Sequence, residues 1–155
     1  MEQVSSQPSL EVLSVGPSVT IQDFGRHGFR GLGLASSGAV DSAALYEGAA
    51  LLGQPPEYAA LEMFMFGGRF RVHGSLRIAL TGAVMRATIS GKRISWNQTI
   101  LVNDNDIIDI GQVERGCVGY LHVGGGIDVP SELGSKSAHV FAGLGKTIGV
   151  GDFIK

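Results

Sequence analysis

Short apolar segments separated by turn residues fill the chain from Met63 onward, and they restrict the fold more than any other feature. The segments are rich in β-branched and aromatic residues, and glycine, asparagine and aspartate lie between them. They cover residues 70–72, 77–81, 87–90, 99–102, 106–110 and 117–123. Short strands that recur at roughly 8–12-residue spacing are typical of a β-barrel or a β-sandwich. The sequence therefore predicts a mainly β fold.

One helix is expected before these strands, at residues 39–52. Alanine and leucine fill it, Asp41 or Ser37 can cap its start, and Gly53 followed by two prolines ends it. Pro56 can then open a second short helix, because proline suits the first helical position.

Two further strands are expected near the start of the chain, at residues 10–15 and 19–21. Together these patterns predict a single barrel domain over residues 10–155, with one or two short helices inserted near its N-terminus. Residues 1–9 are polar and are expected to form a disordered leader.

Charge and composition exclude several classes of partner. The chain has 155 residues, a net charge of −2 and no stripe of lysine and arginine, so nucleic acid and anionic membranes are not expected. No apolar run approaches the length of a membrane span, and the N-terminus does not resemble a signal peptide, so we expect a cytoplasmic protein. The charged share of 17% is below the usual ~25%, which suggests that a partner covers part of the surface.

No metal motif is found, because the four histidines are widely spaced and none lies at ligand spacing from another histidine or a cysteine. Cys117 is the only cysteine and lies in an apolar run, where we expect it to be buried. His122 lies in the same run and is expected to be a histidine of the barrel interior with a hydrogen-bond partner.

The glycine-rich segment from Thr20 to Asp41 is the strongest candidate for a binding site. Arginine can hold a carboxylate through two parallel hydrogen bonds, and a nearby aspartate can orient the guanidinium or accept a substrate N–H. The candidate substrate-binding residues are Gln22, Asp23, Arg26, Arg30, Ser37 and Asp41. The alternative is a scaffold, in which the glycines take positive φ angles and the aspartates cap turns.

Five stretches in order carry a resemblance to a known family. They are residues 20–41, ALLG with AALE (50–53 and 59–62), IALTGA (78–83), YLHVGGGIDVP (120–130) and LGSKSA (133–138). The chain resembles the KipA, or allophanate hydrolase subunit 2, family, which includes the third subunit of bacterial 5-oxoprolinase and half of the carboxyltransferase part of urea carboxylase. It departs from the family pattern at Ala49, Lys136 and Ala138.

This resemblance implies a cyclophilin-like β-barrel and a subunit with two such halves, of which this chain matches the first. It implies a non-autonomous subunit of a 5-oxoprolinase-type enzyme, which opens a cyclic amide using ATP. Arg26 or Arg30 would then hold the substrate's carboxylate. Backbone N–H groups of Thr81 and Gly82, or of Gly124, Gly125 and Gly126, would face a phosphate or oxyanion, unless these residues only form turns at strand ends.

Two alternative functions follow from the same resemblance. One is a KipA-type regulatory protein that binds a KipI-like inhibitor of a sensor kinase. The other is half of a urea carboxylase-like carboxyltransferase domain, and only this alternative requires biotin. The expected partners are a KipI-like subunit, the missing second half, a LamB/YcsF-type subunit or a second copy of the chain, and ATP is expected only in the assembled enzyme.

Overall fold

The computed structural model describes residues 7–155, and the leader expected over residues 1–9 falls largely outside this range. The strands are β1 (Ser9–Val15), β2 (Val19–Gln22), β3 (Ala60–Phe64), β4 (Gly68–His73), β5 (Leu76–Ile89), β6 (Lys92–Arg93), β7 (Thr99–Val102), β8 (Ile107–Val123) and β9 (Phe153–Ile154). The helices are α1 (Ser42–Leu52) and two 3-10 turns, η1 (Arg30–Leu32) and η2 (Val140–Ala142).

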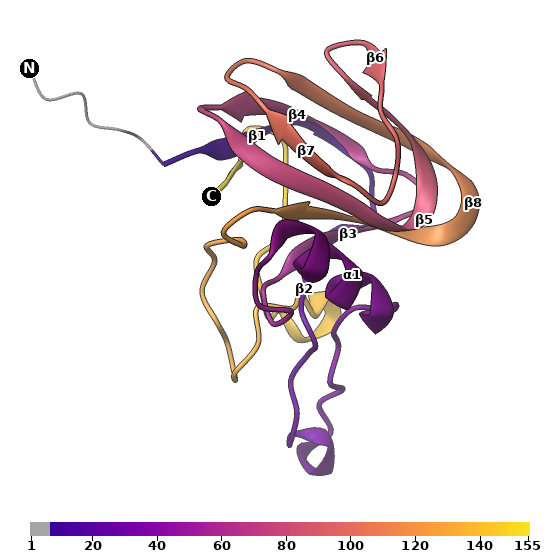
Figure 1. Cartoon of the computed structure of the whole chain (residues 1–155). Coiled ribbons are helices and arrows are strands. Elements are labelled where there is room, and N and C mark those ends of the chain that lie inside the picture. The colour runs from indigo at the N-terminus through magenta and orange to yellow at the C-terminus, as the bar shows by residue number, and fades with distance from the viewer. Residues whose placement is uncertain (1–6) are drawn as a thin grey trace, which may run out of the picture.

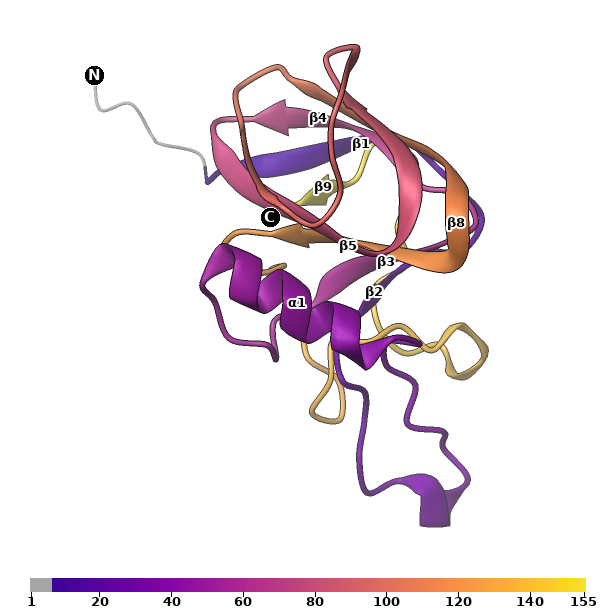
Figure 2. The ribbon, with the colours of Figure 1, turned by 45° about the vertical axis from the view of Figure 1, so that its right-hand side comes forward.

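All of these strands belong to one antiparallel sheet that curls on itself (Figures 1 and 2). The order along the sheet is β2-β3-β8-β4-β1-β9, and β5 pairs with β8 and also carries β6 and β7. The first and last strands are neighbours, since Leu10 pairs with Ile154. The prediction of a mainly β, barrel-like fold is confirmed.

Two long strands make the curl, where the sequence indicated four short ones. Segments 77–81 and 87–90 are both part of β5, and segments 106–110 and 117–123 are both part of β8. The glycines between them bend the strands without ending them: Gly82 has φ 73° and Gly116 has φ 95°. The β5–β8 register shifts three times between Gly82 and Ala87, as expected where bulges bend a strand.

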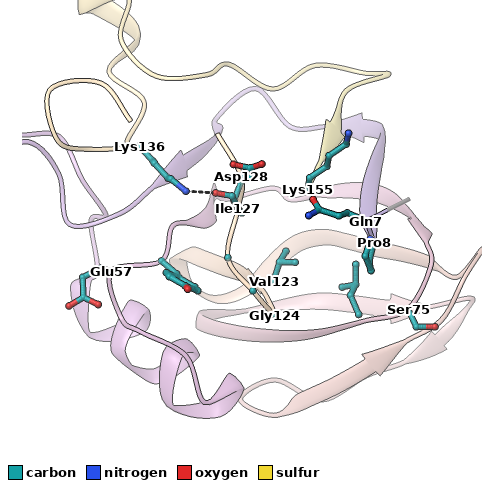
Figure 3. A pocket seen from close by; sticks show the side chains of 14 residues that line it. Gln7, Pro8, Glu57, Ser75, Val123, Gly124, Ile127, Asp128, Lys136 and Lys155 are labelled. Carbon is teal, nitrogen blue, oxygen red and sulfur yellow. Dashed lines mark hydrogen bonds between the residues drawn. The ribbon is translucent and has the colours of Figure 1, made fainter. Parts of the chain in front are cut away.

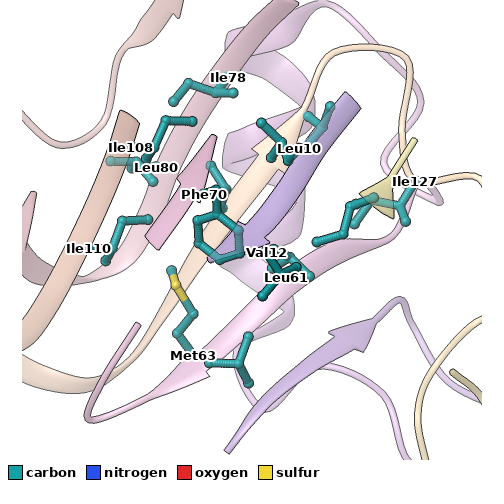
Figure 4. Close-up of a cluster of buried hydrophobic side chains, with 14 of the residues drawn as sticks. Leu10, Val12, Leu61, Met63, Phe70, Ile78, Leu80, Ile108, Ile110 and Ile127 are labelled. Atoms are coloured by element: carbon teal, nitrogen blue, oxygen red, sulfur yellow. The ribbon is translucent and has the colours of Figure 1, made fainter. Parts of the chain in front are cut away.

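The main core fills the inside of the curl. Figure 4 shows Phe70 at its centre, with Leu10, Leu61 and Ile108 among the side chains around it. All four side chains are completely shielded from solvent. They come from β1, β3, β4 and β8, so this core joins strands that are far apart in the sequence.

Helix α1 covers part of the outer face of the same sheet (Figure 2). Ala44 and Leu45 form a second buried cluster there with Val118 and Tyr120. The helix begins after Asp41, whose carboxylate accepts hydrogen bonds from the backbone of the first turn, and it ends at Gly53, which has φ 66°. The predicted cap at Asp41 and the predicted stop at Gly53 are confirmed.

The second short helix expected from Pro56 is wrong. Residues 55–58 form a turn, closed by a hydrogen bond from Tyr58 N to the carbonyl of Pro55. The alanines that follow enter β3, which lies between β2 and β8. Pairing on both sides and burial of Ala60 and Leu61 therefore override the helix propensity of this stretch.

The expectation that Cys117 is buried is also wrong, since it is exposed. It follows the bend at Gly116, and the part of β8 that packs against α1 begins at Val118. The apolar run is thus covered on both faces only from its second residue onward.

Candidate functional site

Asp23 joins the end of β2 to a loop more than a hundred residues later in the chain. Its carboxylate accepts hydrogen bonds from the hydroxyls of Ser135 and Ser137, both at 2.6 Å. It also accepts from the backbone N–H groups of Lys136 at 2.7 Å and Gly25 at 2.8 Å. Burial alone would raise the pKa of Asp23, but these hydrogen bonds outweigh burial and lower the pKa below its ordinary value.

Arg26 binds the same loop through its carbonyl groups. Its Nε donates to the carbonyl of Glu132 at 3.1 Å, and its Nη2 donates to that of Ser137 at 2.6 Å. The side chain is only 1% exposed. Arg26 was expected to face a cleft, whereas it lies in the interior. A direct contact with substrate stays a prediction. We refer to Asp23, Arg26, Ser135 and Ser137 as the clamp.

Gln22 lies beside the clamp and is also buried. Its Nε2 donates to the carbonyl of Ala138 at 3.2 Å and to the hydroxyl of Thr20 at 3.0 Å. Gln22 Oε1 and Arg26 Nη1 are buried without a hydrogen-bond partner. Each would be expected to bind an internal water, since buried polar atoms are rarely unpaired.

The other predicted residues of the opening segment lie apart from the clamp. Arg30 lies in η1, on the segment that projects from the sheet between β2 and α1, and bonds only Ser36 in the same segment. Ser37 is exposed with φ 52°. Asp41 caps α1. The six candidates therefore do not converge on one point.

A hydrogen-bond network that the sequence did not indicate lies at the start of α1. The Tyr120 hydroxyl donates to Glu62 Oε2 at 2.6 Å and accepts from the backbone N–H of Asp41 at 2.9 Å. Burial, together with the nearby carboxylate of Glu62, raises the pKa of Tyr120 far above its ordinary value. Tyr120 thus stays protonated and fixes the helix start on the sheet.

Thr81, predicted to face a phosphate, is fully buried under α1. Its hydroxyl donates to the carbonyl of Ala44 at 2.9 Å and lies 2.8 Å from His122 Nε2. The imidazole packs against Gly48, where an added methyl group would overlap the ring. Thr81 and His122 therefore connect the sheet to the helix, and His122 has the hydrogen-bond partner that was expected of it.

The glycine turn after β8 lies on an open cavity of about 690 Å³ (Figure 3). Its backbone N–H groups are already engaged: Gly124 donates to the carbonyl of Arg77, Gly125 to Gln54 Oε1, and Gly126 to the carbonyl of Val123. The turn is thus correctly placed at a cavity, but its N–H groups are occupied by partners in the chain itself rather than free for a phosphate.

Lys136 reaches the same cavity from the clamped loop, although in the sequence it stood out only as a departure from the family pattern. Its Nζ donates to the carbonyl of Ile127 at 2.7 Å (Figure 3). Asp128 and Tyr58 also line the cavity. The alternation Ser-Lys-Ser is the one sequence signal for it, because it places the lysine on the opposite side from two serines.

Among residues 7–155, no group of three or more histidine, cysteine, aspartate and glutamate side chains could hold a metal ion. Within the same part of the chain, no helix has both the length and the apolar character needed to cross a membrane.

Comparison with known proteins gives consistent relatives. The chain is 33% identical to urea amidolyase of Lachancea kluyveri over 138 residues, and 32% identical to the third subunit of 5-oxoprolinase of Escherichia coli over 136 residues. Each match covers 88% of this chain. The crystal structure of Kluyveromyces lactis urea amidolyase superposes with a TM-score of 0.92 at 32% identity, over 98% of this chain and 10% of that one.

The chain spans less than half of the length of these relatives. It covers 44% of the E. coli subunit and 8% of the Lachancea urea amidolyase. The family model for the carboxyltransferase domain, subdomain A and B, matches residues 32–155. This match includes α1, the glycine turn, Lys136 and both serines of the clamp, and it follows that the chain belongs to the carboxyltransferase domain family, subdomains A and B.

Proposed function

We propose that the chain is one half of a 5-oxoprolinase-type subunit that takes part in ATP-dependent opening of a cyclic amide and has no activity alone. The observation that carries this proposal is the match to the third 5-oxoprolinase subunit, of which the chain covers 44%. A partial match of this kind favours an active site completed by another stretch of protein.

Exposed apolar side chains support the need for a partner. Leu32 at the tip of the projecting segment is 84% exposed, and Val140 and Phe141 in η2 are 66% and 101% exposed. Large apolar side chains that water surrounds in the isolated chain are typical of surfaces that another protein covers. The proposed occupant is the second half of the family subunit, carried by a second chain or by a further segment. KipI-like and LamB/YcsF-type subunits are the proposed further partners.

ATP is proposed to bind outside this chain. Of the two places expected to face a phosphate, one has its N–H groups bonded within the chain, and at the other Thr81 is fully buried with its hydroxyl engaged. These residues do not fit a triphosphate, so no step through ATP is assigned to them. The cavity beside the glycine turn is the place where a small substrate fits.

The test is 5-oxoproline-dependent ATP hydrolysis. We expect no turnover by the purified chain and turnover once the second half and the proposed partner subunits are added. Turnover by the chain alone would contradict the non-autonomous role. A complete assembly that leaves 5-oxoproline unchanged would contradict the proposed substrate.

A urea carboxylase-like role is the second candidate, because the urea amidolyase relatives match at least as well in sequence and the Kluyveromyces structure superposes closely. This candidate predicts carboxylation of urea that depends on biotin carried by another domain. Loss of that activity after addition of avidin, together with inactivity on 5-oxoproline, would favour it. The KipA-type regulatory alternative stays a prediction.

A further inference from the structure

We propose that Lys136 is the anion-binding residue of the cavity beside the glycine turn, that its ligand is a small monocarboxylate, and that the clamp is what aims Lys136 into that cavity. This inference deepens the proposed function, on which it depends only for the choice of 5-oxoproline as a probe.

The clamp holds the backbone on both sides of Lys136. The hydroxyls of Ser135 and Ser137 both donate to Asp23, and the carbonyl of Ser137 accepts from Arg26. The backbone N–H of Lys136 itself donates to Asp23 at 2.7 Å. Since the two serine side chains point to Asp23, the lysine side chain between them points the other way, as alternate residues of an extended segment do.

The lysine side chain therefore enters the cavity from a fixed origin. Ser135 and Ser137 are 1% and 0% exposed, whereas Lys136 is half-buried at the cavity wall. Its ammonium group has three N–H donors, and the carbonyl of Ile127 takes one of them. Two donors remain for a ligand.

The charges around the cavity select a monoanion. Lys136 and Lys155 line it together with Glu57 and Asp128, so the lining has no net charge. The glycine turn, whose N–H groups are engaged, offers no cradle for a phosphate. A polyphosphate would meet two carboxylates and two cations, while a single carboxylate can bind Lys136 alone.

The uncharged part of the lining suits a compact apolar body. Val123, Leu76 and Tyr58 lie on the cavity wall. A ring or short chain attached to the carboxylate would pack against them, and Asp128 is placed on the same cavity to accept an N–H from the ligand.

The test is a titration of the full chain at low salt, followed by two-dimensional NMR of the backbone amides. The probes are 5-oxoproline, 2-pyrrolidinone, which is the same ring without the carboxylate, and inorganic phosphate. We expect 5-oxoproline to shift the signals of Gly124–Gly126 and Lys136, and to bind more tightly than the other two probes.

Variants of the lysine separate its role from general folding. Lys136→Gln should weaken 5-oxoproline binding about ten- to hundredfold, the usual loss for a charge-assisted hydrogen bond, and should leave the weak binding of 2-pyrrolidinone unchanged. Lys136→Arg should retain most of the affinity. Lys92→Gln, an exposed lysine of β6, is the matched control and should bind as the wild type does. Unchanged affinity in Lys136→Gln, no binding of any carboxylate, or preference for phosphate would each overturn the inference.

A double-mutant cycle tests the positioning role of the clamp. Ser137→Ala should weaken 5-oxoproline binding several-fold in the wild-type chain and have no effect in the Lys136→Gln background, because its influence passes through the lysine. Equal losses in both backgrounds would mean that Ser137 supports the fold alone. Binding is measured without turnover, so an inactive assembly with lysine-dependent carboxylate binding would refute the proposed function and leave this inference standing.

Discussion

Arg26 donates to carbonyl groups of a distant loop from a fully buried position, and this determines what its removal does. Arg26→Ala loses the bonds to Glu132 and Ser137 and leaves their carbonyls unpaired. We expect a loss of about 3 kcal/mol in the free energy of unfolding, typical of a broken buried network. Urea unfolding measures it. Arg30→Ala, at an exposed arginine of the same segment, is the control and should change stability by less than about 0.5 kcal/mol. Similar midpoints for both variants would contradict the clamp.

His122 should make stability depend on pH in a window where few other groups titrate. Its burial under α1 lowers its pKa to about 4. In the unfolded chain a histidine takes up a proton near pH ~6.5, while the folded chain stays neutral until about pH 4, so acid favours the unfolded state. The contribution is complete above pH ~6.5 and is lost as the pH falls, by about 3 kcal/mol in total.

Urea unfolding at pH values from about 7.5 to about 4.5 measures this dependence. His122→Gln should flatten the slope in that window, whatever its effect at neutral pH. Asp23 does not interfere, because its pKa is lowered and its stabilising contribution is lost only when the pH falls below the ordinary range of a carboxylate. An equal slope in the wild type and the variant would refute the role of His122.

Helix α1 is fitted to the sheet at Gly48. Helix propensity alone predicts that Gly48→Ala stabilises by about 1 kcal/mol. An added methyl group would instead overlap the His122 imidazole, so we expect a net loss of about 1–3 kcal/mol. Thermal unfolding with calorimetry measures the sign. Ala50→Gly, at an exposed position of the same helix, is the control and should cost about 1 kcal/mol. Stabilisation by Gly48→Ala would show that the helix is free to move away.

The elements that the sequence predicted correctly are those defined by local chemistry. The Asp41 cap and the Gly53 stop depend on neighbouring residues, and both were recognised. The failures depend on pairing. Ala60 is in a strand because β2 and β8 flank it, and Gly82 bends β5 instead of ending it because β8 continues alongside.

The candidate site was predictable to a smaller extent for the same reason. The segment 20–41 was correctly singled out as unusual, and the glycine turn does lie at a cavity. The burial of Arg26 could not be predicted, since its partners Glu132 and Ser137 lie 106 and 111 residues away in the sequence. Lys136 gains its importance only once the clamp fixes its direction.

On the scale of the whole molecule, exposed apolar side chains predict association. At high concentration we expect the isolated chain to self-associate weakly, because its most exposed large apolar side chain, Phe141, and its neighbour Val140 have no cover. The double variant Val140→Ser with Phe141→Ser should reduce this association and leave the free energy of unfolding within about 0.5 kcal/mol of the wild type. Sedimentation equilibrium measures it, with Leu101→Ser on β7 as the control. A monomeric wild type at every concentration would contradict this prediction.

The clamp also orders events in time. Asp23 and Ser137 are separated by 114 residues, so their contact closes a loop that spans most of the domain. Closing so large a loop is entropically costly and belongs late in folding. During synthesis Asp23 and Arg26 emerge from the ribosome long before the serines that neutralise their burial. The nascent barrel must therefore keep these two charged groups hydrated until its last stretch arrives, and the final step of folding is the expulsion of that water.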